Sequence, residues 1–161
     1  MHKLFFSFLM IVLWWLLHAM QLEEETALGT LHEGKRAVDR AAHAAAQQVD
    51  EPSLEAGTPS IDPVRAEAAA RAYLAANLRL ASDLSPLNGG WLESAPEIVD
   101  FAVINERHAF PYTYRNEAYD YEVTLRRPGV VMIVHLSCPR IFGVIDPIEW
   151  DLKGAAELVF A

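Results

Sequence analysis

The stretch LFFSFLMIVLWWLLHAM, residues 4–20, contains no aspartate, glutamate, lysine or arginine. Three consecutive glutamates, residues 23–25, follow almost immediately, and the remainder of the 161-residue chain is far more polar. A helix over residues 4–22 would be about 28 Å long at 1.5 Å per residue, close to the roughly 30 Å thickness of a bilayer's hydrocarbon core. The stretch therefore predicts a transmembrane helix over residues 1–22, with the lipid bilayer as its partner.

A cleaved signal peptide is the alternative interpretation of this stretch. Signal peptidase requires small residues at positions −3 and −1 of the cleavage site and a basic start. A cut after Ala19 would place the large Leu17 at −3, and no A-x-A pattern follows. The start is only weakly basic, with His2, Lys3 and the amino group. An uncleaved signal anchor is therefore favoured over cleavage.

The charges that flank the span predict its orientation. Lys3 and the amino group precede the span, whereas the acidic residues 23–25 follow it, and basic flanks stay in the cytoplasm. Lys35, Arg36 and Arg40 lie further along and weaken this argument, but long domains translocate largely regardless of charge. We expect a single-pass protein of the cell membrane with a cytoplasmic N-terminus and an extracytoplasmic C-terminal domain.

The polar part of the chain is acidic and contains one cysteine. The net charge is −9, and all 22 acidic side chains lie beyond Met20. An acidic surface argues against nucleic acid and against anionic lipid as partners. Because Cys138 is the only cysteine, no internal disulfide can form, and the stability of the domain must come from its core.

The helix is expected to continue beyond the membrane as an amphipathic helix over residues 23–50, which contain no proline. Apolar or small residues recur there at helical spacing, at Leu31, Val38, Ala42, Ala45 and Val49. Gly29 and Gly34 predict a bend or a short break. The stripe either packs on its own domain or, together with Leu28, forms part of a face that contacts other copies or partners. In both cases the small alanines favour close approach of the helices.

Residues 51–161 are expected to form one α+β domain. Two prolines and a glycine interrupt residues 50–59, and a second helix then begins at the cap Asp62 with Pro63 in its first turn and ends near Leu80. A loop follows over residues 82–96.

From Glu97 the apolar period changes to two. Val99, Phe101 and Val103 are expected on one strand face, and residues 119–125 alternate as a half-buried strand. The turn at residues 127–129 predicts a hairpin between that strand and its successor.

The apolar run at residues 130–134 predicts a central strand, and short strands are expected at residues 141–145 and at the edge over residues 158–160. Helices followed by a meander of strands indicate an α+β fold, with helices on one face of a small antiparallel sheet.

No residue pattern identifies catalysis, a cofactor or a metal. Membrane-anchored sortases are similar in placing a cysteine at a strand end with a distant histidine and an arginine, as Cys138 and Arg140 would be. His135 should point to the opposite strand face from Cys138. His108 could be the partner of Cys138 only if the fold brings the two together. A buried structural cysteine is the simpler interpretation. His32 lies too far from His43 on the helix to share a metal.

Two aromatic segments remain open to two interpretations each. Residues 110–114, FPYTY, are either a recognition tip or a cover for the edge of the sheet. Glu149-Trp150-Asp151 either form an exposed patch or place Trp150 where it closes the core.

The layout resembles pilin-like proteins, in particular the tight-adherence (TadE-like) minor pilins. The similar segments are AVDRAAHAAAQQVD at residues 37–50 and IDPVRAEAAARAYLAANL at residues 61–78, within the first 80 residues. Two departures, the lack of a glycine cleavage site before the apolar segment and of a glutamate within it, argue against processing and polymerisation as a major pilin.

The resemblance implies a non-enzymatic, membrane-anchored accessory or structural protein of a surface filament or secretion apparatus. Its N-terminal helix would contact other membrane, pilus or secretion components, and the candidate assembly face is Leu28, Leu31, Val38, Ala42, Ala45 and Val49. The alternatives are a membrane-tethered enzyme that uses Cys138 and an extracellular ligand-binding or sensor module.

Overall fold

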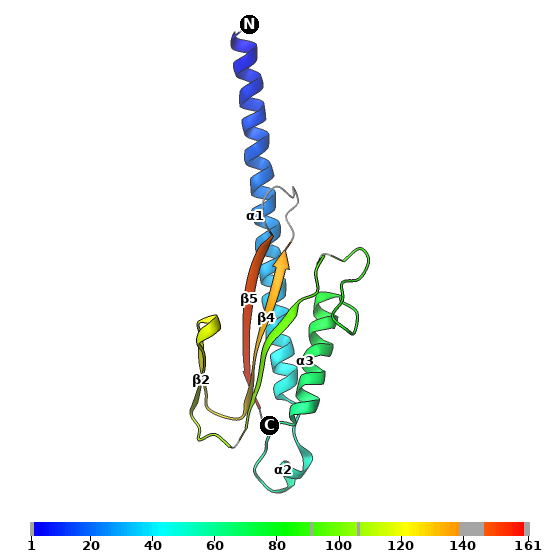
Figure 1. Cartoon of the computed structure of the whole chain (residues 1–161), viewed down its shortest axis with the longest axis vertical. Coiled ribbons are helices and arrows are strands. Elements are labelled where there is room, and N and C mark those ends of the chain that lie inside the picture. The colour runs from blue at the N-terminus through cyan, green and yellow to red at the C-terminus, as the bar shows by residue number, and fades with distance from the viewer. Residues whose placement is uncertain (1, 91, 106, 139–146, 160–161) are drawn as a thin grey trace.

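The apolar and the alanine-rich stretches form one helix, α1 (His2–Ala46), which dominates the molecule (Figure 1). The computed structural model describes residues 2–90, 92–105, 107–138 and 147–159. Helical structure is continuous through Gly29 and Gly34, so the break considered there does not occur. Among residues 2–26 none is buried, and α1 is long and apolar enough to be compatible with a single membrane span.

The second half of α1 packs against a shorter helix that runs back beside it (Figure 1). After α1 the chain forms the short helix α2 (Glu51–Glu55). Val49, which precedes α2, pairs with Ile61, which follows it, in an isolated antiparallel bridge. α3 (Pro63–Leu78) begins as predicted, because Asp62 Oδ1 accepts hydrogen bonds from the backbone N–H groups of Val64 and Arg65. α3 ends at Leu78, because the next residue, Arg79, has a left-handed φ of 55°.

Alanines form the buried contact between the two helices. The buried positions of α1 at this level are Ala37, Val38, Ala41, Ala42, Ala45 and Ala46. Those of α3 are Ala66, Ala70, Leu74, Ala75 and Leu78. Small side chains let the helices approach closely, so most of the stripe predicted from the sequence packs inside the domain.

A three-stranded antiparallel sheet lies against α1. Its strands are β1 (Glu97–Ile104), β4 (Gly129–Cys138) and β5 (Ile148–Glu157), in the order β1-β4-β5. β4 is central, as the run at residues 130–134 predicted, and Val130 through Val134 are all fully buried. The chain thus has an α+β fold, with both helices on one face of an antiparallel sheet.

The hairpin predicted across residues 127–129 is wrong. β3 (Tyr121–Leu125) pairs with β2 (Tyr112–Asn116) in a separate two-stranded sheet, and Tyr119 lies in the 3₁₀ helix η1 (Glu117–Tyr119) between them. β4 is apolar at successive positions and needs cover on both faces. The half-exposed β2–β3 hairpin supplies that cover on the face opposite α1, where Leu125 and Val131 belong to one cluster.

The prediction that Val99 shares a face with Phe101 and Val103 is also wrong. The register of β1 against β4 shifts between Ile98 and Asp100, which leaves Val99 as the extra residue of a bulge. Ile98 therefore joins Phe101 and Val103 against the main core. The shift also places Asp100 on the hairpin side of the sheet, where Tyr114 and Asn116 bind its carboxylate.

The last strand lies earlier than predicted. β5 ends at Glu157, and Leu158 is buried beyond its end rather than within an edge strand. Residues 148–157 do alternate, with Ile148, Trp150 and Leu152 on the helix side, so the sequence signal for β5 was present but missed. The strand expected at residues 141–145 lies outside the described residues.

Candidate assembly face on the long helix

The residues of the proposed assembly face have different surroundings in the structure. Val38, Ala42 and Ala45 are fully buried inside the domain, so they belong to the intramolecular packing that the sequence left open. Leu31 is half-buried and packs against the main core, and Val49, also half-buried, lies beyond the end of α1. Only Leu28, 48% exposed, stands clear of the domain.

Leu28 belongs to an open face on the part of α1 next to the apolar half. It lines a shallow hollow of about 460 Å³ together with Gln21, Glu24, Glu25, Gly29 and His32. Each of these residues lies three or four positions from at least one other, so the set occupies one side of the helix. We call these six residues the juxtamembrane face.

The chemistry of this face suits contact with another helix. A Cβ at Gly29 would meet no atom within 4 Å, so the glycine leaves open space beside Leu28. A helix partner could approach closely there and bury Leu28. Carboxylates at Glu24 and Glu25 frame the apolar side chain and would favour basic or hydrogen-bond-donating groups on the partner.

Cys138 lies at the end of β4 and faces α1. It is 5% exposed, and its thiol donates a hydrogen bond to Thr30 Oγ1 at 3.5 Å. His135 points to the other face of β4, where its Nδ1 lies 2.9 Å from Asp151 Oδ1, as the strand spacing predicted. His108 instead contacts the ring of Tyr112, with ring centroids 4.2 Å apart.

The environment of His135 is polar and partly exposed. Its Nε2 lies 3.9 Å from Glu149 Oε2, and Glu97 is its cross-strand neighbour on β1. Within the part of the chain that the structure describes, no group of three or more histidine, cysteine, aspartate or glutamate side chains is arranged to hold a metal ion. His135 and Asp151 form a surface pair across two strands.

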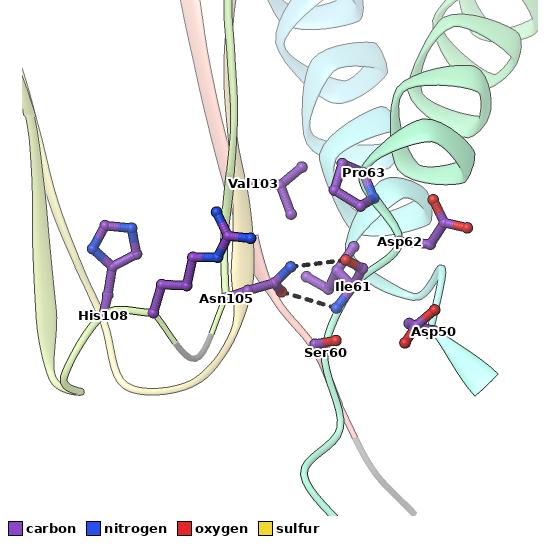
Figure 2. Close-up of a pocket in the computed structure, with 9 residues that line it drawn as sticks. Asp50, Ser60, Ile61, Asp62, Pro63, Val103, Asn105 and His108 are labelled. Carbon is purple, nitrogen blue, oxygen red and sulfur yellow. Dashed lines mark hydrogen bonds between the residues drawn. The ribbon is translucent and has the colours of Figure 1, made fainter. Parts of the chain in front are cut away.

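A hollow of about 690 Å³, which was not predicted from the sequence, lies at the end of the domain farthest from the apolar helix half (Figure 2). Asn105 forms part of its wall and binds the backbone of Ile61 twice, donating to the carbonyl at 2.8 Å and accepting from the N–H at 2.9 Å. Asp50 and Asp62 also line the hollow, but both accept hydrogen bonds as helix caps. The two hydrogen bonds of Asn105 join the end of β1 to the segment just before α3.

The aromatic segment covers the sheet rather than standing free as a tip. Phe110, Tyr112 and Tyr114 are half-buried and pack around the cluster that contains Val131. The Tyr114 hydroxyl donates to Asp100, and the Asn116 amide donates to the same carboxylate oxygen at 2.6 Å. Burial, and next the hydrogen bond to Asp100, raise the pKa of Tyr114 above its ordinary value of 10. Trp150 likewise packs half-buried against the main core.

Comparison with protein-family models, with curated proteins and with solved structures found no match to this chain.

Proposed function

We propose that this chain is a non-enzymatic, membrane-anchored, pilin-like accessory or structural protein of a surface filament or secretion apparatus. Its N-terminus would lie in the cytoplasm and its α+β domain outside the membrane. One observation carries the proposal: α1 is a single helix whose first half is exposed and apolar and whose second half is a wall of the folded domain. Such a helix links a membrane span rigidly to an outer domain.

The juxtamembrane face supports a role in assembly. Leu28 is an exposed apolar side chain only six residues beyond Leu22, in a stretch where the domain already covers Ala27 and Thr30 on the other side of the helix. An apolar residue beside open space at Gly29 is a suitable contact for a neighbouring membrane helix.

Cysteine crosslinking in native membranes tests the proposal. Single cysteines are placed at Leu28, Leu31, Glu33 and Arg36 in a full-length Cys138→Ala background. Glu33 and Arg36 are the controls, because they are exposed on α1, pair with each other and lie at least one helical turn farther along α1 than Leu28. Leu31→Cys, half-buried against the core, should react more weakly than Leu28→Cys.

We expect Leu28→Cys to crosslink to another membrane protein or to a second copy, at least several-fold more than Glu33→Cys or Arg36→Cys. Equal crosslinking at all positions, or none at any, would leave α1 as a plain stalk and remove the support for an assembly role.

A further inference from the structure

The end of α3 lies close to the level at which the expected membrane span ends. α3 starts near the end of α1, where Val49 pairs with Ile61, and runs back along α1 (Figure 1). Its 16 residues cover about 24 Å, the same length as the last 16 residues of α1. Arg79, just beyond α3, accordingly shares a hollow with Gly29 and Thr30 of α1.

This level can be compared with the dimensions of a bilayer. Thr30 lies about 12 Å along the helix beyond Leu22, at 1.5 Å per residue. The headgroup layer on each side of the hydrocarbon core is roughly 5–8 Å thick. If the span ends at Leu22, the end of α3 stands about 4–7 Å outside the headgroups. A loop that extends past α3 in this direction would reach them.

The connection between α3 and β1 extends in this direction (Figure 1). Its residues 84–90, LSPLNGG, carry no charged side chain, and Leu87 is 51% exposed. The loop is held in place at its base, because Leu84 is buried and Leu80 pairs with Pro86. The exposed residues 87–90 form a turn in which Gly90 N–H donates to the Leu87 carbonyl at 2.8 Å, and Gly89 takes the positive φ of 80°.

We propose that the exposed turn at residues 87–90 rests on the zwitterionic headgroups of the bilayer that α1 spans, with the Leu87 side chain among them. The domain would then touch the membrane at two places, the helix and this loop. The inference depends on the membrane anchoring proposed above.

The charges around the loop specify the lipid. The protein carries a net charge of −9, and Asp83 lies exposed directly before the loop, where Ser85 donates hydrogen bonds to its carboxylate. Both disfavour anionic headgroups, so we expect phosphatidylcholine rather than an anionic surface. The contact requires little affinity of its own, because α1 holds the loop beside the bilayer at a high effective concentration.

Fluorescence quenching in phosphatidylcholine vesicles tests this contact on the full-length protein. Single cysteines in a Cys138→Ala background carry a polarity-sensitive fluorophore, and the lipid carries a nitroxide at its headgroup. The test positions are Leu87 and Asn88. Leu54 in α2 is the matched control, since it is 53% exposed but lies at the opposite end of the domain. Leu22, at the expected end of the span, reports insertion of α1 itself.

We expect quenching at Leu87 and Asn88 to be several-fold stronger than at Leu54, with blue-shifted emission at Leu87. Strong quenching at Leu22, with Leu87 and Asn88 no different from Leu54, would overturn the loop contact and leave the anchoring intact. Absence of quenching at Leu22 would overturn the anchoring, and the inference with it.

Discussion

Two glycines of α1 show how far single residues determine the packing of this fold. A Cβ at Gly34 would come within 2.7 Å of Leu152 Cδ1 and 2.8 Å of Leu136 Cδ2, whereas a Cβ at Gly29 would meet nothing within 4 Å. On the opposing surface, a Cβ at Gly154 would come within 2.8 Å of Val38 Cγ1. Glycines on both sides therefore bring α1 and the sheet close together.

Gly34→Ala is expected to lower the free energy of unfolding by about 1 kcal/mol. Overpacking costs about 1–3 kcal/mol, and the better helix propensity of alanine returns up to about 1 kcal/mol. The control Gly29→Ala should leave stability unchanged or raise it by up to about 1 kcal/mol. Urea unfolding of the full-length variants in detergent, followed by circular dichroism, measures both. Equal stability of the two variants would contradict the close contact at Gly34.

Cys138→Ala is expected to cost at most about 1–2 kcal/mol of stability and to leave membrane localisation intact. The reason is that the buried thiol packs as a small hydrophobe against Thr30. In the native wild-type protein, Cys138 should react with a thiol reagent far more slowly than a cysteine placed at Leu28. Complete loss of function in a folded Cys138→Ser protein would contradict this structural role and favour the enzyme alternative.

At the scale of elements, the β2–β3 hairpin is joined to the main sheet by one polar contact and one apolar cluster. The contact is the carboxylate of Asp100, which accepts from Tyr114 and Asn116. The cluster is formed by Ile104, Leu125 and Val131. The bulge at Val99 makes this arrangement possible, because it turns Asp100 toward the hairpin while Ile98 stays in the core.

The free energy of unfolding of Tyr114→Phe is expected to fall less steeply at alkaline pH than that of the wild type. Burial and the bond to Asp100 raise the pKa of Tyr114 in the folded state, so the folded state holds this proton more tightly than the unfolded state. The stabilisation is complete below pH 10 and is lost as the pH rises above it. Urea unfolding between pH 8 and 11 should therefore show a decline in the wild type that is weaker in Tyr114→Phe. Since burial also raises the pKa of Tyr121, a part of the decline should remain. Parallel curves would contradict the shift at Tyr114.

Elements whose signals are local were predicted from the sequence. The cap Asp62 with Pro63 marked the start of α3, and the run at residues 130–134 marked a central strand. Strand pairing was not predicted, because a turn at residues 127–129 looks the same whether or not its two strands pair. The bulge at Val99 depends on Asp100 meeting a hairpin that is distant in sequence.

The candidate site was predicted only in part, for a related reason. Helical spacing placed Leu31, Val38, Ala42 and Ala45 on one stripe, but spacing cannot say whether α3 and the sheet or another molecule covers that stripe. Only the folded structure separates the exposed Leu28 from these covered positions.

For the whole molecule, the proposed orientation predicts that the domain is accessible from outside the cell. Protease added to intact cells or protoplasts should remove a tag placed after Ala161, while a cytoplasmic marker stays intact. The expectation follows from the basic Lys3 before the span and the glutamates after it. Survival of the tag, or release of a soluble form without residues 1–19, would contradict it.

Because α1 is unbroken, it sets the rotation of the domain about the helix axis as well as the distance of the domain from the apolar half. Because the helix turns about 100° and rises about 1.5 Å per residue, the rotation of the domain about the helix axis depends on the number of residues between Leu22 and Ala27. One inserted residue would lift the domain slightly but turn it by more than a quarter of a circle relative to the span. In the proposed membrane arrangement, the segment would therefore set which side of the domain meets a neighbour that is bound within the membrane.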